Sequence, residues 1–324
     1  MSLRNIMGII ISRLRGRRNR QSSLHNVSLP NHNLKINKLI GEGGFANVYL
    51  VTDKDTNEQF ALKMFTCMED EQRITFAKTE INTLKKFSGK SPHIIELIDT
   101  DDLQSVLLPF YQNGTIQSII DNERERRGLQ PYIPIPGMFQ RNSILRIISD
   151  VCIALEFFHN HNPPLAHRDI SPANILIKED DTNILRGVIM DFGSTANARP
   201  SVETYSDCVA LQELAESTCS ALYRAPELYD VNSHTLVDER SDIWSVGCIL
   251  YFMMYGISPF EYAYKEGGSI KLAVLGGSPT YYEEGFDEEL VALIKQIFVE
   301  SDKRLSSKDL LSKIEELQMF DELD

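Results

Sequence analysis

The chain has 324 residues, of which 42% are hydrophobic and 24% charged, a globular composition that excludes wholesale disorder and collagen-like structure. Its net charge of −13 argues against a general nucleic-acid-binding surface, and no apolar run approaches the ~20 residues of a membrane-spanning helix. The five cysteines are widely spaced and form no C-x-x-C motif, which indicates free thiols in a reducing cytosol.

Residues 1–32 are predicted to form a basic, disordered arm. Six arginines lie in residues 1–20, whereas the first acidic residue of the chain is Glu42. Residues 7–12 match the myristoylation pattern M-G-x-x-x-S, which requires Met7 to be the initiating residue and Gly8 the mature amino terminus. The arginines would then supply the second membrane signal that one acyl chain needs. The alternative is a basic tail with a chance match.

The rest of the chain is predicted to form a small β-rich region followed by a larger, mainly helical one. Apolar runs separated by glycine and polar turns indicate three strands, and apolar residues three and four apart then indicate a helix. These predicted elements cover residues 34–40, 48–51 and 60–64 for the strands and 70–87 for the helix. A long amphipathic helix is predicted from Ile144 to Phe158.

A glycine cluster between the first two predicted strands suits contact with phosphates. Gly41, Gly43 and Gly44 are followed by a strand, whereas a Rossmann or Walker loop would run into a helix. Backbone amides can approach phosphates there without a Cβ clash. On the next strand Lys63 could reach the α/β-phosphates, held by Glu80 of the following helix. Taken alone, a glycine hairpin of this kind is more often only a turn. The plain alternatives for Lys63 and Glu80 are a solvated charge on a strand and a glutamate on a helix surface.

The motif that is most specific for fold and function lies in residues 167–176. It has the form H-R-D-x-x-x-x-N, with Asp169 and Asn174 at the required spacing. Asp191 begins a later Asp-Phe-Gly, and Ala-Pro-Glu follows at residues 225–227. Chance assembly of these motifs in this order is negligible. Over residues 34 to about 320, the chain therefore resembles the eukaryotic protein kinases.

Several stretches are similar to the Numb-associated kinase family, and in particular to its small, single-domain branch. They are residues 41–46, 191–194, 210–228 and 233–256, together with the hinge-like residues 107–110. The resemblance implies a bilobal α+β protein kinase fold. Its expected organisation is an arm at residues 1–32, an N-lobe at 33–112 and a C-lobe at 113–320. It also implies a cytoplasmic protein lying peripherally on Golgi or other endomembranes.

The resemblance further implies transfer of the γ-phosphoryl group of ATP to serine or threonine hydroxyls of proteins, with autophosphorylation. Asp169 would accept the hydroxyl proton, Lys63 would hold the α/β-phosphates, and Asn174 and Asp191 would bind Mg²⁺ or Mn²⁺. The residues expected to bind ATP are Gly41, Gly43, Gly44, Val48, Ala61, Lys63, Glu80, Leu108, Pro109, Phe110 and Leu176. We expect a monomer with a protein substrate and no nucleic-acid partner.

The resemblance also implies structural roles for residues that do not take part in the phosphoryl transfer. We expect Asp242 to hold the His-Arg-Asp backbone, Glu227 to pair with Arg304, and His167 to pack with Phe192. The activation segment, residues 194–224, is expected to carry an extra helix capped by Ser206 or Asp207. Phosphorylated hydroxyls of this segment would pair with Arg168.

Ser171 departs from the pattern, because protein-serine/threonine kinases usually place a lysine there to contact the transferred phosphoryl group. Loss of one such contact lowers a rate by roughly 10²–10³-fold. Arg199 or the substrate would have to supply a compensating cation. The alternative function is therefore a catalytically impaired scaffold or ATP-binding module. A small-molecule phosphotransferase is opposed by the activation segment and the Ala-Pro-Glu motif, which build a ledge for a peptide.

Overall fold

The computed structural model describes residues 26–66, 70–233, 235–261 and 267–321. They belong to two compact units. The first comprises the chain up to Ala77 together with Leu97–Phe110, and the second comprises Lys78–Glu96 and everything from Tyr111 onward. Helix α2 (Glu71–Phe87), which lies where a helix was predicted, carries the chain from the first unit into the second.

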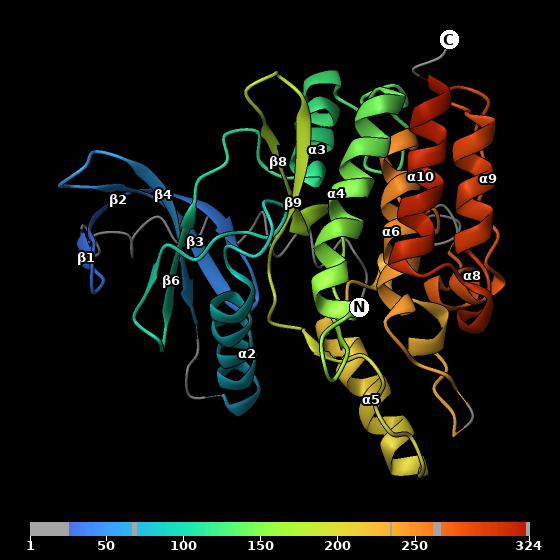
Figure 1. Cartoon of the computed structure of the whole chain (residues 1–324), viewed down its shortest axis with the longest axis horizontal. Coiled ribbons are helices and arrows are strands. Elements are labelled where there is room, and N and C mark those ends of the chain that lie inside the picture. Colours follow the sequence, from blue (N-terminus) through green and yellow to red (C-terminus); the bar gives the residue numbers. More distant parts are fainter. Residues whose placement is uncertain (1–25, 67–69, 234, 262–266, 322–324) are drawn as a thin grey trace. The chain divides into compact units, whose positions relative to one another are not determined.

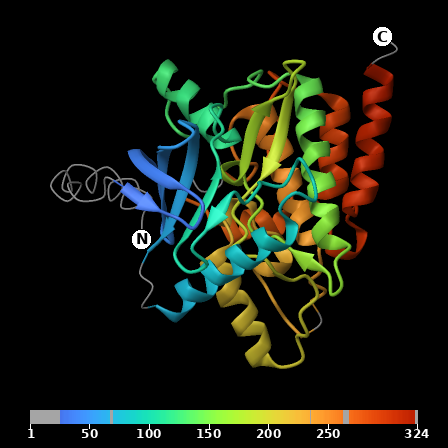
Figure 2. The ribbon, with the colours of Figure 1, turned by 60° about the vertical axis from the view of Figure 1, so that its left-hand side comes forward.

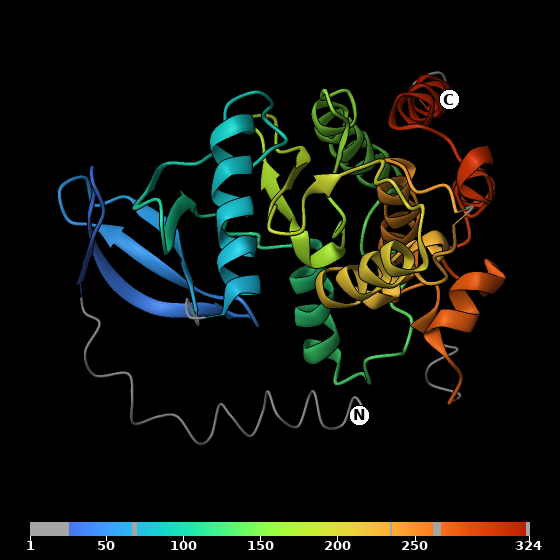
Figure 3. The same ribbon diagram turned by 90° about the horizontal axis from the view of Figure 1, so that it is seen from below.

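The first unit is built on a six-stranded antiparallel sheet with strand order β1-β2-β3-β4-β6-β5. Its strands are β1 (Asn26–Ser28), β2 (Asn33–Glu42), β3 (Ala46–Asp53), β4 (Gln59–Phe65), β5 (Asp99–Thr100) and β6 (Ser105–Pro109). Figures 1 and 3 show the long strands curving strongly. Alternate residues point to one face, where Leu34, Val51, Leu62 and Leu107 form a buried cluster. The three predicted strands are thus confirmed as β2, β3 and β4.

The sheet begins earlier than the sequence indicated. β1 lies inside residues 1–32, which were predicted to form a disordered arm, and it pairs with β2 through Val27 and Leu34. The following turn is fastened to β5, because the amide nitrogen of Asn31 and Nδ1 of His32 each lie 2.9 Å from Oδ2 of Asp99. These polar contacts join groups 67 and 68 residues apart in the chain, which explains why no local pattern revealed them.

The second unit is mainly helical. Its helices are α3 (Ile116–Arg127), α4 (Arg141–His159), α5 (Tyr205–Thr218), α6 (Arg240–Tyr255), α8 (Ile270–Gly276), α9 (Glu288–Ile297) and α10 (Ser307–Asp321). Fifteen of the sixteen residues of α6 are buried, as expected for a central helix that is apolar on all sides. α4 and α9 pack on α6, and α10 packs on α4 (Figure 1). The predicted long helix is confirmed as α4.

Short strands and turns complete the second unit and carry most of its motifs. β8 (Ile175–Glu179) and β9 (Leu185–Ile189) form a hairpin that lies against α4 (Figure 2). β7 (Leu165–Ala166) pairs with β10 (Ala196–Asn197). Single turns of 3₁₀ helix are η1 (Pro172–Asn174), η2 (Ala221–Tyr223), η3 (Pro226–Leu228) and η4 (Ser301–Lys303).

Two expectations from composition can be compared with the described residues. Four cysteines, Cys152, Cys208, Cys219 and Cys248, are buried free thiols, while Cys67 lies outside the described part of the chain. Burial raises the pKa of the Cys219 thiol to about 11, so this side chain is a weak nucleophile. Of the helices in the described ranges, none has the length and apolar character needed to cross a bilayer.

The activation segment does contain the expected extra helix, α5, but its cap differs from the prediction. The N-cap is Thr204, whose side chain accepts a hydrogen bond from the amide of Asp207 at 3.2 Å. Asp207 occupies the third helical position and accepts from the Thr204 amide at 2.8 Å, which closes a capping box. The hydrogen bonds that the hydroxyl and the amide of Thr204 donate to the Asp207 carboxylate lower the pKa of this carboxyl. Ser206 is exposed and is not the cap.

Replacing the cap should loosen the start of α5. We expect Thr204→Ala to cost about 1 kcal/mol of local stability, because the amide of Asp207 loses its acceptor. Hydrogen–deuterium exchange of peptides covering residues 205–211 should become faster, since local opening there becomes less costly. Ser206→Ala is the matched control and should leave the exchange unchanged. Equal effects of the two substitutions would show that the capping box does not stabilise this helix.

Candidate active site

The loop after β7 is held by one buried carboxylate. Asp242, on α6, accepts the amide of His167 through Oδ2 at 2.8 Å and the amide of Arg168 through Oδ1 at 2.9 Å. Arg168 has φ +70°, a backbone conformation that costs free energy in a non-glycine residue and that these hydrogen bonds hold in place. Burial acts to raise the pKa of Asp242, but the hydrogen bond with His159 keeps it below its ordinary value. The expected role of Asp242 is confirmed.

Three hydrogen bonds from two residues hold Asp169 in place. Nδ2 of Asn174 donates to its carboxylate Oδ2 at 2.9 Å and to its carbonyl oxygen at 2.8 Å. The amide of Ser220 donates to Oδ1 at 2.8 Å. Desolvation raises the pKa of the Asp169 carboxyl, the nearby Asp191 raises it further, and the hydrogen bonds from Ser220 oppose these effects. The side chain is thus a fixed, electron-rich acceptor whose proton affinity exceeds that of an ordinary aspartate.

Asp191 lies two residues beyond the end of β9 and also adopts a left-handed backbone conformation, with φ +65°. The next residue, Phe192, is fully buried and meets the ring of His167 edge-on with centroids 5.3 Å apart. Nε2 of His167 lies 3.1 Å from the carbonyl oxygen of Met190. The expected packing of His167 with Phe192 is therefore present, and it fixes the backbone on both sides of Asp191.

The donor set near Asp169 fits a hard divalent cation. Because the Asn174 amide nitrogen is committed to two oxygens of Asp169, the amide oxygen is the atom left to bind a cation. Mg²⁺ typically takes one or two protein oxygens and fills its other positions with phosphate oxygens and water. Within the described ranges, three or more His, Cys, Asp or Glu side chains never gather closely enough to hold a metal without such a partner.

In the first unit, the glycine cluster forms the tip of the β2–β3 hairpin. The Gly43 amide donates to the carbonyl oxygen of Ala46 at 2.9 Å. A Cβ added to Gly44 would meet no atom within 4 Å, so the space over the loop is open. The ring of Phe45 stacks on Phe76 of α2 with centroids 4.2 Å apart, which holds the loop to the helix.

The other predicted nucleotide-binding residues of the first unit lie on adjacent strands. Val48 of β3 faces Lys63 of β4, and Ala61 of β4 faces Leu108 of β6. Pro109, at the end of β6, faces Phe60, and Phe110 follows directly. Lys63 is only 8% exposed, which is rare for a lysine and indicates a placed charge. The register thus gathers Gly41, Val48, Ala61, Lys63 and Leu108 on the four neighbouring strands β2, β3, β4 and β6.

Of the predicted nucleotide-binding residues, two lie in the second unit. Glu80, on α2, is 1% exposed, and Leu176, on β8, is 9% exposed. A solvated surface glutamate, the plain alternative for Glu80, is therefore wrong. The pairing of Lys63 with Glu80 stays a prediction.

Two contacts were missed by reasoning from the sequence. Nη2 of Arg168 donates to the carbonyl oxygens of Asn197 at 3.2 Å and Ala198 at 2.9 Å, so the activation segment supplies backbone acceptors where a phosphate was expected. Arg199 makes a two-pronged ion pair with Glu239, at 3.0 and 2.6 Å. It would have to leave this pair to compensate for Ser171, which is itself 2% exposed.

Residues 34–314 match the family model described as protein kinase domain, and the chain belongs to this family. It has the bilobal α+β fold of protein kinases and is of the serine/threonine class. Kinases of this family act on proteins and in general use ATP with a divalent cation.

Among its relatives, serine/threonine-protein kinase 16 of Homo sapiens is 32% identical over 86% of this chain and 88% of its own length. A "probable serine/threonine-protein kinase" of Dictyostelium discoideum is 32% identical over 87% of this chain and 93% of its own. Serine/threonine-protein kinase ppk13 of Schizosaccharomyces pombe is 29% identical over 89% and 92%, respectively.

Proposed function

We propose that this chain is an active kinase that transfers the γ-phosphoryl group of MgATP to serine and threonine hydroxyls of proteins and to its own chain. The observation that supports this most directly is the carboxylate of Asp169, which Asn174 and Ser220 hold by hydrogen bonds of 2.8 to 2.9 Å. A carboxylate fixed in this way can orient a hydroxyl nucleophile before the reaction, which removes an entropic cost from the transfer step.

In this mechanism each motif residue has one task. Asp169 accepts a hydrogen bond from the substrate hydroxyl and takes its proton as the new P–O bond forms, while the bond from the γ-phosphorus to the bridging oxygen breaks and ADP leaves. Asn174 and Asp191 would hold Mg²⁺, which when bound neutralises phosphate charge. Lys63, fixed by Glu80, contacts the α/β-phosphates, and the loop amides at Gly43 and Gly44 close over them. The adenine ring contacts Val48, Ala61, Leu108 and Leu176, and the backbone of Pro109 and Phe110 binds its polar edge.

The raised pKa of Asp169 gives a prediction for the pH dependence of transfer. The base must be unprotonated, so activity falls as the pH drops through its pKa. Since the Ser220 side chain lowers that pKa, Ser220→Ala should raise it and move the acidic limb of the kcat/KM profile to higher pH. Ser217→Ala, a nearby serine that bonds only the Leu214 carbonyl, should leave the limb in place. A limb unmoved or lowered in Ser220→Ala would contradict this role.

The second candidate function is a catalytically impaired scaffold, and Ser171 is the feature that favours it. Autophosphorylation separates the two candidates. Purified chain is incubated with MgATP, and phosphate is located by mass spectrometry, with Asp191→Asn as control. We expect phosphate on exposed hydroxyls of the activation segment, such as Ser201 and Thr204. No incorporation by a chain that still binds ATP would favour the scaffold, and Ser171→Lys would then be tested for a gain of transfer.

Membrane attachment through residues 1–20 is a further part of the proposal, with the protein lying peripherally on Golgi or other endomembranes from the cytoplasmic side. The pattern at Met7 and Gly8 lies outside the described residues. One myristoyl chain binds membranes only marginally, so the six arginines should add the attraction to anionic lipid. Because no cysteine occurs in the arm, palmitoylation there is not available.

Co-sedimentation with vesicles tests this attachment. A chain beginning at Gly8 and carrying myristate should bind vesicles that contain phosphatidylserine, and binding should weaken with salt. Gly8→Ala, which cannot be acylated, should bind at least tenfold less. Equal binding of the two chains would overturn the lipid proposal.

We further propose that the chain is a monomer. Light scattering after size-exclusion chromatography should therefore give the mass of one chain.

A further inference from the structure

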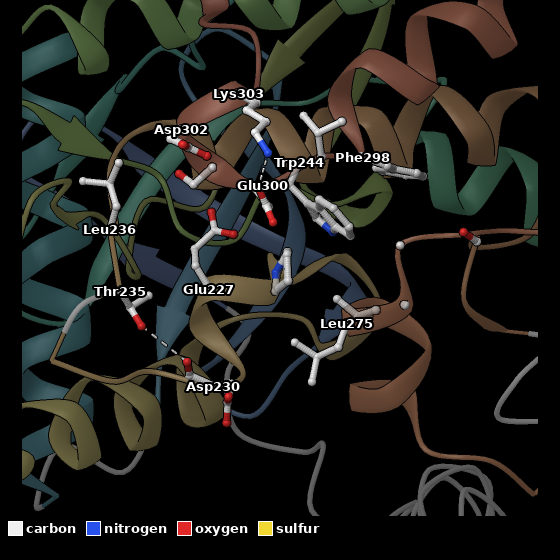
Figure 4. Close-up of a pocket in the computed structure, with 17 residues that line it drawn as sticks. Glu227, Asp230, Thr235, Leu236, Trp244, Leu275, Phe298, Glu300, Asp302 and Lys303 are labelled. Carbon is white, nitrogen blue, oxygen red and sulfur yellow. Dashed lines mark hydrogen bonds and ion pairs between the residues drawn. The ribbon is translucent and has the colours of Figure 1, made fainter.

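A pocket of about 960 Å³ opens in the second unit, lined by residues that have no role in the proposed catalysis or nucleotide binding. Four stretches of the chain line it, and they contribute Pro226, Glu227, Asp230, Thr235 and Leu236, then Trp244 of α6, then residues 274–278, and finally residues 298–303. Figure 4 shows acidic and apolar side chains facing one another across it. A space of this size admits several side chains of a peptide rather than one ion.

The charge of this pocket is negative. Four carboxylates line it, Glu227, Asp230, Glu300 and Asp302, against one cation, Lys303. Arg304 neutralises Glu227, Lys303 pairs with Glu300, and Lys271 lies 3.3 Å from Asp230. The Asp302 side chain is exposed and makes no ion pair with any described residue. The pocket would therefore attract a cation and repel an anion.

Apolar surface lies beside these carboxylates. Leu236 is 52% exposed and Leu275 is 43% exposed, and both line the pocket together with Phe298 and Trp244. Exposed large apolar side chains that converge on one hollow mark an interaction site more strongly than scattered ones. A ligand that fits must consequently present apolar groups next to its positive charge.

One buried donor in the wall of the pocket points to a missing acceptor. Trp244 is 1% exposed, and its indole Nε1 has no hydrogen-bond partner in the described part of the chain. Arg304 does not line the pocket, but its guanidinium lies 5.1 Å from the centroid of the Trp244 ring, and its Nε has no partner among the described residues either. In Figure 4 this indole stands between Glu300 and Leu275. Buried donors normally have an acceptor, and a peptide carbonyl oxygen is one.

We propose that this pocket docks a segment of a partner protein in which an arginine or lysine neighbours a leucine-like residue. The basic group lies against Asp302 and Glu300, the apolar side chain against Leu275 and Phe298, and a backbone carbonyl faces the Trp244 indole. The site selects basic segments through complementary charge, as at other interfaces. This goes beyond phosphoryl transfer, because binding here requires neither ATP nor the catalytic carboxylates.

The chain carries a built-in probe for this site, because Trp244 is its only tryptophan. The acetylated and amidated peptide Gly-Leu-Arg-Arg-Leu-Arg-Gly is titrated into the full chain without nucleotide, with glutamine in place of arginine in the control peptide. We expect a saturable change of tryptophan fluorescence with the arginine peptide and none with the control peptide. The dissociation constant of the arginine peptide should rise at least threefold when NaCl rises from 0.1 to 0.5 M. Calorimetry measures the same dissociation constant independently of the fluorescence.

Matched variants locate the binding. Asp302→Asn should weaken it about threefold and Leu275→Ala about fivefold. Glu284→Gln removes an exposed charge elsewhere, and Leu272→Ala removes an exposed leucine one turn earlier on α8, so neither should matter. Equal binding of the glutamine peptide, equal dissociation constants in all four variants, or no heat and no fluorescence change would overturn the proposal. Kinase activity is measured separately, so its presence or absence does not affect the result.

Discussion

Asp169→Asn should lower kcat for phosphoryl transfer by about 10²–10⁴-fold while leaving the KM for ATP nearly unchanged. An amide cannot take the hydroxyl proton, whereas the contacts that bind nucleotide lie on other residues. The loss should appear in kcat and in kcat/KM for the protein substrate equally, as expected when an interaction acts in the transition state. Initial rates with radiolabelled ATP at saturating and limiting substrate give both constants.

The matched control is Asp181→Asn, which removes an exposed carboxylate from the turn between β8 and β9. It should keep full activity. Thermal melting must show that Asp169→Asn is folded, because Asn174 and Ser220 donate to this side chain and an amide satisfies them less well. A folded Asp169→Asn chain with more than a tenth of normal kcat would show that another group is the base.

Arg304→Met should be the most destabilising single change in the second unit. The Arg304 side chain is 0% exposed and donates to Glu227 at 2.7 and 3.0 Å, to the carbonyl of Arg240 at 2.8 Å and to that of Val299 at 3.0 Å. Its loss leaves a buried carboxylate without its cation, which costs about 3–5 kcal/mol of the free energy of unfolding. Urea unfolding followed by circular dichroism would measure this as a large drop in the midpoint.

Two further variants test whether the loss of stability comes from the burial of the Glu227–Arg304 pair. Arg126→Met removes an arginine that forms a similar two-pronged pair with Glu123, but its side chain is 70% exposed, so the cost should be near zero. The double variant Glu227→Leu/Arg304→Met removes both charges and should recover part of the loss, because no unpaired carboxylate remains. Equal midpoints for Arg304→Met and Arg126→Met would contradict the account of the buried pair.

Much of the active site could be predicted because its chemistry requires fixed residue types at fixed spacing. Asp169, Asn174 and Asp191 were assigned from motifs alone, and the structure brings Asn174 within 2.9 Å of the Asp169 carboxylate. The partnership of Glu227 with Arg304, 77 residues apart, came from the family resemblance and is also confirmed. The strands β2 to β4 were readable because their glycine and polar turns separate clear apolar runs.

Features fixed by long-range contacts could not be read in this way. Strand β1 forms because a short polar segment pairs with β2 and its turn is held by the distant Asp99. The cap of α5 is Thr204 rather than Ser206 because the backbone enters the helix two residues earlier than the apolar spacing suggested. The pocket at Trp244 joins four segments whose assembly no local sequence pattern predicts. Arg168 donates to the backbone carbonyl oxygens of Asn197 and Ala198, and no pattern of side chains in the sequence predicts such acceptors.

Whether the chain is an active serine/threonine kinase is tested most directly by phosphoryl transfer from radiolabelled MgATP to a generic protein substrate. The phosphorylated amino acids are identified after hydrolysis. An active kinase of this class should place phosphate on serine and threonine, and Asp191→Asn should abolish the signal. If the wild-type chain binds MgATP and yet transfers no more phosphate than Asp191→Asn, the chain is a nucleotide-binding scaffold and the proposed catalysis is wrong.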